Sequence, residues 1–571
     1  MFLKYAVSTD HKHIGLLYAV TSLFFLLVGF SLVMLIRWQL AYPGQPISWI
    51  GGLLGATNAP GGIVSPEFYN QLGAMHGTIM VFLGVVPLAV GAFGNYLLPL
   101  QIGAPDMAFP RWNLVSYWFY FAGGAVMLAS FFVTGGAANN GWTSYAPLSD
   151  LAPNHGQTMW LTGMLLLIFS SLLGAVNFIT TVAQLRAPGL TWFRLPFFVW
   201  AQFITAFLLL LAFPALQAAA ILQGMDRLVH TSFFLPSGLA VAGRPLDVAG
   251  GGSALLWQHL FWFLGHPEVY VLILPAMGIV AEVITNNTRK PLWGYRAMVY
   301  SVFVLGFLSF VVWAHHMFLT GMGTTISAFF QATTMIISIP SVVILSSLIL
   351  SLHGGSIRFT TPMLFALAFL PMFGIGGLTG LPLGLATTDI PLHDTNYVVG
   401  HFHYLVAPGT IFALFAGIYH WFPRVTGRMM NDALGKIHFA GSVICMNIIF
   451  LPMFAQGLAG VNRRLWDGGA DQIHAQGVLY LNEPMLIGAL GLAFFQLFFI
   501  VNLVTSLVAG RRVARNPWEA TTLEWHSDDA PLRVYRDPYD YSVPGAAFDF
   551  VPQHQQHHHP ELVPQSGPAG G

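Results

Sequence analysis

Six histidines have the clearest chemical capacity in the sequence, because all of them lie inside long apolar stretches: His76, His266, His315, His316, His401 and His403. An unpaired polar group in hydrocarbon costs several kcal/mol, so packing alone does not explain six imidazoles there. If the apolar stretches cross a membrane alternately, the six lie in the same half of it. Imidazole is a common metal ligand, and we therefore expect this set to bind metal.

The spacing of these histidines indicates more than one site. His401 and His403 project about 200° apart on a helix, so they serve two different sites on opposite faces. His315 and His316 project about 100° apart and can converge on one site. With His266 they make three imidazoles with an open position, a ligand set suited to copper or zinc.

His76 is left to pair with one of the two histidines at positions 401 and 403. Two imidazoles on opposite sides of an iron are what a six-coordinate haem requires. The other histidine of that pair would then hold a five-coordinate haem.

The composition indicates that these histidines sit in a polytopic membrane protein. Of the 571 residues, 55% are apolar and only 8% are charged, and the formal net charge is zero. A soluble protein carries roughly 25% charged residues. These values exclude a cytosolic enzyme, a disordered chain and a nucleic-acid binder with a basic face. The single cysteine, Cys445, excludes a disulfide framework and a cysteine-based metal cluster.

A membrane-spanning helix needs about 20 mostly apolar residues. This criterion predicts an all-α protein with about twelve transmembrane helices, near residues 14–38, 68–99, 114–135, 156–180, 195–225, 255–287, 296–322, 324–353, 360–382, 396–423, 435–458 and 485–510. We expect residues 1–510 to form one twelve-helix domain and residues 511–571 to form a polar C-terminal tail.

The basic residues predict the orientation of the helices. With a cytoplasmic N-terminus, 17 of the 22 Lys and Arg residues lie on the cytoplasmic side, which places both termini there. The tail ends in a histidine cluster formed by His554, His557, His558 and His559. We interpret the tail as a solvated extension.

Three motifs around the histidines point to a known family: 266–270 (HPEVY), 313–318 (WAHHMF) and 393–404 (HDTNYVVGHFHY). Two further motifs lie near the ends, at 8–12 (STDHK) and 521–525 (TTLEW). Together they resemble subunit I of the A-type haem-copper oxygen reductases, and the likeness covers nearly the whole chain. It implies an enzyme that reduces O₂ to water with electrons from cytochrome c and pumps protons.

The resemblance implies a role for each histidine. His76 and His403 would ligate a low-spin haem and His401 a high-spin haem, both haem A. The three histidines at positions 266, 315 and 316 would ligate one copper, and Phe402 would lie between the haems. Tyr270 would be joined covalently to a copper-ligand histidine and supply an electron and a proton.

The resemblance also implies a proton path that ends at Glu268. This carboxyl lies deep in an apolar helix, where ionisation is costly, and such a group suits proton relay. The path would begin at Asp106 and follow a series of polar residues: Asn95, Asn113, Ser116, Ser170, Ser171 and Asn177.

On the outer side, the resemblance assigns Arg463 and Arg464 to the haem propionates, with Trp142 close by. Arg37 would face the formyl group of the low-spin haem. Two further residues would hold a Mg²⁺ or Mn²⁺ ion at the interface with a partner subunit: His393 and Asp394. The implied partners are a copper-bearing subunit II and other oxidase subunits, and the implied location is the bacterial cytoplasmic membrane.

The sequence departs from the family at its second proton path. Ile344 stands where the family has a lysine, and Ala281 where it has a serine, while Glu282 follows directly. We therefore expect protons to use another route during the early reduction steps, entered at Glu282.

The electron donor follows from a second comparison. Quinol-using relatives carry Arg, Asp and His where this chain has Val28, Leu32 and Phe68, although Gln71 matches them. This favours cytochrome c over the alternative of a quinol donor. A nitric oxide reductase is disfavoured because the tyrosine at position 270 and the polar series from position 106 are present. From a different class, a secondary transporter could also carry intramembrane His, Asp and Glu residues, but no inverted repeat is visible.

Overall fold

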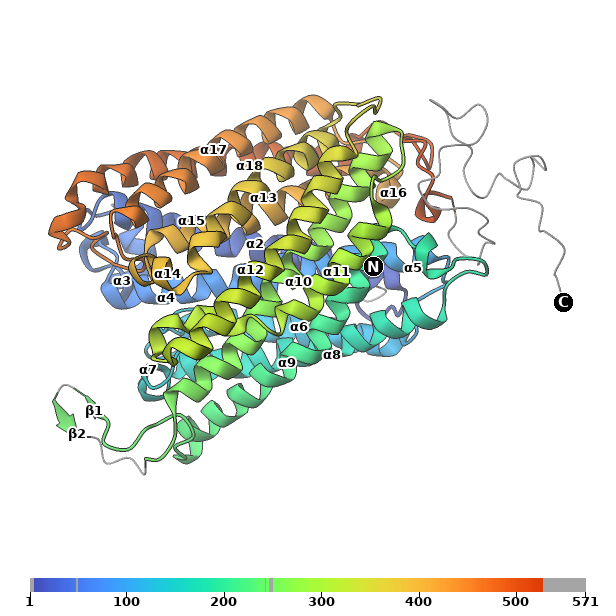
Figure 1. Ribbon diagram of the computed structural model, residues 1–571. Helices are drawn as coiled ribbons and strands as arrows, with labels where there is room; N and C mark the ends of the chain where they lie inside the picture. Colours follow the sequence, from blue (N-terminus) through green and yellow to red (C-terminus); the bar gives the residue numbers. More distant parts are fainter. Residues whose placement is uncertain (1–4, 48–49, 242, 246–249, 527–571) are drawn as a thin grey trace, which may run out of the picture.

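The computed structural model describes residues 5–47, 50–241, 243–245 and 250–526. In these residues twelve helical segments are long and apolar enough to cross a membrane, which confirms the predicted number. They form one elongated bundle (Figure 1). The histidine cluster predicted at positions 554–559 lies outside the described residues.

The spanning segments are built from the following elements: α2 (His11–Ala41), α4 (Pro66–Thr78) with η2 (Ile79–Val85), η3 (Pro87–Gly94) and α5 (Asn95–Ile102), α6 (Pro110–Ala129) with η4 (Ser130–Phe132), α8 (His155–Gln184), α9 (Phe197–Val229), α10 (Ala254–Thr288), α11 (Tyr295–Ser309) with η6 (Trp313–Thr320), α12 (Gly323–Leu350), α13 (Thr361–Leu383), α15 (Asn396–Leu405) with η7 (Val406–Ile411) and α16 (Phe412–Thr426), α17 (Asp432–Leu458), and η8 (Ile473–Leu481) with α18 (Asn482–Ala509).

Shorter elements lie between the spans: α3 (Gly51–Asn58), η1 (Pro60–Gly62), α7 (Leu148–Leu151), η5 (Trp192–Arg194) and α14 (Ala386–Leu392). A further short element, η9 (Leu523–Trp525), follows the last span. The strands β1 (Ala240–Val241) and β2 (Arg244–Pro245) form a small antiparallel hairpin. The hairpin projects from one end of the bundle, beyond α9 (Figure 1).

Burial distinguishes central spans from peripheral ones. In the most apolar part of each span, 89% of α10, 83% of the span over Pro66–Ile102 and 72% of the span over Asn396–Thr426 is buried, against 22% for α2 and 28% for α12. These three central spans carry four of the six intramembrane histidines. Small residues allow the close packing, since a Cβ at Gly278 of α10 would lie 2.8 Å from Phe198 Cα of α9.

Two of the central spans are not regular α-helices. Ile79–Gly94 and Val406–Ile411 have π-helical turns, which shift the direction of the side chains that follow. The seventh span ends in the 3₁₀ segment Trp313–Thr320, which carries His315 and His316. The sequence prediction treated this span as one α-helix. In a 3₁₀ segment successive side chains are about 120° apart, and the two histidines still reach one site.

The chain after α18 returns to the bundle. Arg428 donates to the Gly510 carbonyl at 2.8 Å, and Arg289 pairs with Glu519 at 3.0 Å. Further along, Gln101 of α5 donates to the Glu524 carboxylate at 3.1 Å. Residues 511–526 therefore pack against the end of the bundle at which α2 begins.

Candidate metal centre and proton path

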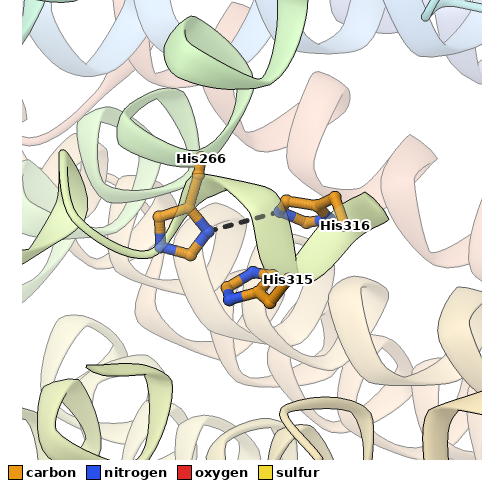
Figure 2. A group of neighbouring side chains, drawn as sticks. All are labelled: His266, His315 and His316. Carbon is orange, nitrogen blue, oxygen red and sulfur yellow. Dashed lines mark hydrogen bonds between the residues drawn. The ribbon is translucent and has the colours of Figure 1, made fainter. Parts of the chain in front are cut away.

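Three imidazoles converge in the interior between α10 and η6 (Figure 2). His266, His315 and His316 each offer a ring nitrogen, and these nitrogens all lie within 4.8 Å of one another. His266 Nδ1 is 3.3 Å from His316 Nε2. Three neutral imidazoles that face one another suit Cu or Zn, which take nitrogen ligands.

Hydrogen bonds orient His315 within this cluster. Its Nδ1 is 2.8 Å from Thr334 Oγ1, and that hydroxyl donates to the Phe330 carbonyl at 2.6 Å. Because the hydroxyl has only one proton, it accepts from the imidazole, so Nδ1 carries the hydrogen. His315 Nε2 is therefore left with a free lone pair for a metal.

The other two rings of the cluster are also held in place. Trp262 stacks on His316, with ring centroids 3.8 Å apart and planes 11° apart. The indole of Trp262 donates to the Tyr145 hydroxyl. His266 is 5% exposed, and its Nε2 has no hydrogen-bond partner among the described residues. The other ring nitrogen, Nδ1, faces His316 and is the one placed to ligate copper together with the other two histidines.

The remaining three histidines share one pattern. The Nδ1 atoms of His76, His401 and His403 lie 2.8, 2.9 and 2.9 Å from main-chain carbonyls, of Gly29, Gly376 and Val399. A carbonyl only accepts, so each Nδ1 donates and each Nε2 is free to bind iron. This donor set fits axial haem ligands.

Neighbouring residues pack closely against the rings of His401 and His403. A Cβ at Gly380 would lie 2.7 Å from His401 Cε1, so glycine allows α13 to approach this ring. His403 stacks on Phe450 with centroids 4.6 Å apart, and Phe402 contacts His403 at 4.3 Å.

Tyr270 and Glu268 lie on α10 near the three-histidine cluster. The ring of Tyr270 is 4.9 Å from that of His266, as expected for residues four apart on one helix face. Glu268 is 1% exposed, and neither of its carboxylate oxygens has a hydrogen-bond partner among the described residues. A buried carboxyl of this kind needs a proton or a water partner.

The predicted proton path begins outside the spans. Asp106 accepts from the Met107 amide at 2.6 Å, and burial raises the pKa of its carboxyl to about 6. Nearby, Asn177 Oδ1 accepts a hydrogen bond from the Phe109 amide at 2.9 Å, and Asn177 Nδ2 donates one to the Phe109 carbonyl at 3.2 Å. The side-chain amide nitrogen of Asn113 is buried and has no hydrogen-bond partner in the part of the chain that the structure describes.

The other members of the predicted series meet at one cavity. Its volume is about 50 Å³, room for several water molecules, and its lining includes Asn95, Ser116, Ser170 and Ser171. Tyr18 also lines it, with its hydroxyl 3.1 Å from that of Ser116.

The sequence reasoning missed Tyr18, because a single tyrosine in an apolar helix has no distinguishing pattern. Glu268 is not among the residues that line the cavity.

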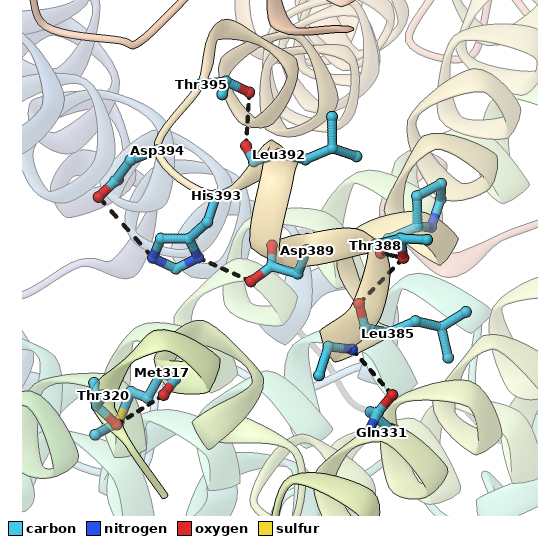
Figure 3. A network of polar contacts seen from close by, with 12 residues as sticks. Met317, Thr320, Gln331, Leu385, Thr388, Asp389, Leu392, His393, Asp394 and Thr395 are labelled. Atoms are coloured by element: carbon cyan, nitrogen blue, oxygen red, sulfur yellow. Dashed lines mark hydrogen bonds and ion pairs between the residues drawn. The ribbon is translucent and has the colours of Figure 1, made fainter. Parts of the chain in front are cut away.

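At the opposite end of the bundle, His393 lies between two carboxylates (Figure 3). Its Nδ1 is 2.9 Å from Asp389 Oδ2 and its Nε2 is 4.0 Å from Asp394 Oδ2. Burial opposes protonation of His393, but the hydrogen bond that His393 donates to Asp389 and the negative charges of Asp389 and Asp394 together outweigh it and raise the pKa of the imidazole. Asp394 also pairs with Arg463. The sequence reasoning missed Asp389, although it lies four residues before His393 on α14.

Contacts are defined for three further predicted residues: Trp142, Arg464 and Arg37. Trp142 packs against Gly77, the residue that follows His76, because a Cβ at Gly77 would lie 2.9 Å from Trp142 Cβ. A Cβ at Gly141 would be 2.9 Å from Arg464 Nη1, so the guanidinium lies against the residue before Trp142. Arg37 donates to Met485 Sδ at 3.7 Å and forms no ion pair among the described residues.

The structure also shows the surroundings of the residues at which the sequence was compared with its relatives. Ile344 and Ala281 are fully buried, and Glu282 accepts from the Phe198 amide at 3.2 Å. Gln71 matches the quinol-using relatives, but its side-chain amide forms hydrogen bonds with main-chain groups of a loop. It donates to Gly135 O and accepts from the Ala137 amide, both at 3.2 Å.

These features define a class of protein: a multi-pass membrane protein whose interior histidines are arranged to hold redox metals. Within that class, residues 13–494 match the family model described as "Cytochrome C and Quinol oxidase polypeptide I". The chain belongs to this family, the catalytic subunit of haem-copper terminal oxidases, and its cofactors include haem and copper.

Curated relatives extend over nearly the whole chain. The "Alternative cytochrome c oxidase subunit 1" of Bradyrhizobium diazoefficiens is 44% identical over 566 residues, covering 97% of this chain and 93% of the relative. The "Cytochrome c oxidase subunit 1" of Synechocystis is 43% identical, covering 94% and 92%. These similarities confirm the oxidase interpretation over a transporter.

A solved structure has the same fold. A chain of a haem-copper terminal oxidase dimer superposes with a TM-score of 0.68 at 19% identity, covering 88% of this chain and 85% of the other. The predicted class of fold, an all-α bundle of twelve membrane-crossing helices, is therefore confirmed.

Proposed function

We propose that this subunit reduces O₂ to water with electrons that come from cytochrome c, and that it couples this reaction to proton pumping. The observation that carries the proposal is the three-imidazole cluster of His266, His315 and His316 beside Tyr270. The copper would bind to these three histidines. When bound, the haems and the copper supply the electron transfer and the O₂ binding that the side chains cannot provide.

The haem assignments rest on the free Nε2 atoms of the other histidines. His76 and His403 would ligate the low-spin haem, and His401 the high-spin haem, both of the haem A type. Each ring is held by a hydrogen bond from Nδ1 to a carbonyl, which fixes its tautomer and direction. Arg37, Arg463, Arg464, Trp142 and Phe402 would contact the haems.

Protons would reach the interior through the chain's own polar groups. Asp106 would take a proton from bulk water on its carboxylate, and the polar series would pass it on through the 50 Å³ cavity. Glu268 would accept it and release it in the interior. Tyr270 would donate the proton of its hydroxyl at the site beside His266.

The supply of electrons to this chain depends on other subunits. The chain has one cysteine, so it cannot build a thiolate-bridged dinuclear copper site, and a copper-bearing subunit II would carry electrons from cytochrome c. The Gln71 amide is already used by main-chain groups, which disfavours a quinol site there. His393 and Asp394 would hold Mg²⁺ or Mn²⁺ with that subunit, and the complex would lie in a bacterial cytoplasmic membrane.

The proposal is tested on the purified complex. Haem is extracted and identified as its pyridine haemochrome, copper is quantified by elemental analysis, and O₂ uptake is measured with reduced cytochrome c and then with a quinol. We expect two haems A per subunit and uptake with cytochrome c alone. Uptake with quinol alone would refute the donor assignment, and a complex without stoichiometric haem would refute the ligand assignments.

A further inference from the structure

A second buried polar cavity lies at the end of the bundle where residues 511–526 pack. It has a volume of about 10 Å³, room for one water molecule. Three ionisable side chains from separate elements line it: Glu282 of α10, His420 of α16 and Glu524 of η9. Thr285, Asn286, Ala520, Thr521 and Thr522 complete the lining.

The side chains around this cavity are buried but incompletely satisfied. Glu524 and His420 are each 1% exposed. Glu524 Oε2, His420 Nδ1 and the Asn286 side-chain nitrogen have no hydrogen-bond partner among the described residues. A water in the cavity could satisfy several of these atoms, because one water makes about three hydrogen bonds.

The remaining contacts hold Glu524 in place. Its Oε1 accepts from Gln101 at 3.1 Å and from the Trp421 indole at 3.4 Å. The guanidinium of Arg424 donates to the main-chain carbonyl of Glu524. Glu282 is 5% exposed and accepts from the Phe198 amide. Burial raises the pKa of the Glu524 carboxyl.

The cavity is close to water on one side, and on the other side α10 runs from it toward the metal cluster. Glu519, directly before the lining residues 520–522, has a side chain that is 63% exposed. Glu282 lies twelve residues after Tyr270 on α10, about 18 Å along the helix axis. The reaction proposed above consumes protons at that cluster.

We propose that Glu282, Glu524 and His420, with one water between them, form a second proton-input site of this oxidase, separate from the path that begins at Asp106. A carboxylate of the site takes a proton from water and forms an O–H bond. That bond then breaks, the proton passes to the water in the cavity and onward, and the carboxylate is restored. No electron moves in this step. The proposal rests on the proposed function and extends the predicted role of Glu282 to two residues that the sequence reasoning did not identify.

The test uses the whole complex with the variants Glu282→Gln and Glu524→Gln. At position 524, glutamine keeps an oxygen that can accept from Gln101 and Trp421, and at position 282 it keeps one that can accept from the Phe198 amide. In neither place can the amide exchange a proton as a carboxyl does. Glu519→Gln is the matched control, since it removes a nearby carboxylate that does not line the cavity. Haem and copper contents are measured first for every variant.

Two measurements decide the proposal. Anaerobic stopped-flow reduction should show the haem at His401 reduced roughly tenfold or more slowly in both cavity variants, and within about twofold of wild type in the control. Infrared difference spectra of reduced against oxidised protein should contain a carboxylic C=O band that shifts in D₂O and is absent from one or both cavity variants.

Unchanged reduction rates and unchanged infrared bands in both variants would overturn the proposal. If Glu524→Gln does not retain haem, His420→Asn is measured in its place and the same outcomes apply. Failure of the proposed function is recognised separately, because the wild-type complex would then lack haem or consume no O₂.

Discussion

Replacing Asp106 by Asn tests the path that leads to the 50 Å³ cavity. Burial raises the pKa of this carboxyl to about 6, from an ordinary value of 3.8. The fraction that carries a proton is then roughly 10% at pH 7 and roughly 1% at pH 8. If proton transfer from Asp106 limits turnover, the rate should fall about tenfold per pH unit above pH 7.

The variant should lose this dependence together with most of the activity. An amide holds its oxygen where Asp106 Oδ1 accepts from Met107, so the loop is preserved, but it cannot transfer a proton. We expect steady-state O₂ uptake to fall roughly 100-fold at pH 7, within the range that general acid–base groups contribute. O₂ uptake is measured from pH 6 to 9, with Asp471→Asn, an exposed aspartate at the opposite end, as the control.

The sign of the stability effect provides a second check. Because the folded state raises the pKa of Asp106, ionisation destabilises the fold progressively as the pH rises from about 4 to about 6. Asp106→Asn should therefore resist thermal unfolding better than wild type at pH 8 and show no advantage near pH 4. A variant with wild-type activity and an unchanged pH profile would refute the path through Asp106.

Two further predictions concern the metal ligands. Thr334→Val removes the acceptor for His315 Nδ1 and should lower copper retention about 10- to 100-fold, measured by dialysis against a chelator. Thr333→Val is the control and should retain copper as wild type does, because the Thr333 hydroxyl donates to main-chain carbonyls and not to a histidine among the described residues. Gly380→Ala places a methyl group 2.7 Å from the His401 ring and should displace it, so that one of two haems is lost or its spectrum altered. Wild-type copper retention in the first variant, or an unchanged haem spectrum in the second, would contradict the corresponding assignment.

Much of the fold could be predicted because a membrane imposes a simple requirement. Each span must be long and apolar enough to cross about 30 Å of hydrocarbon, and this requirement is visible in the sequence alone. The breaks in the helices could not be predicted in the same way. The π-helical turns over Val406–Ile411 and the 3₁₀ segment that carries His315 and His316 lie within stretches whose apolar length alone indicates uninterrupted helix.

In the candidate site, too, some residues could be predicted from the sequence and others could not. Histidine type and spacing were enough to separate the three-imidazole set from the other three, because unpaired imidazoles in hydrocarbon require ligands or partners. The supporting residues were not predictable. Thr334, Tyr18 and Asp389 have ordinary residue types for their positions, and only their contacts with His315, Ser116 and His393 distinguish them.

The sequence by itself determined the class of protein, its twelve spans and the residues able to bind metal, because hydrophobic length and imidazole chemistry are local properties of the chain. Only the tertiary structure decided which ring nitrogen is left free in His76, His315, His401 and His403. It also brought Glu282, His420 and Glu524 to one cavity, although they lie on three elements far apart in the sequence. Hydrogen-bond partners and enclosed volumes arise only when distant segments pack together.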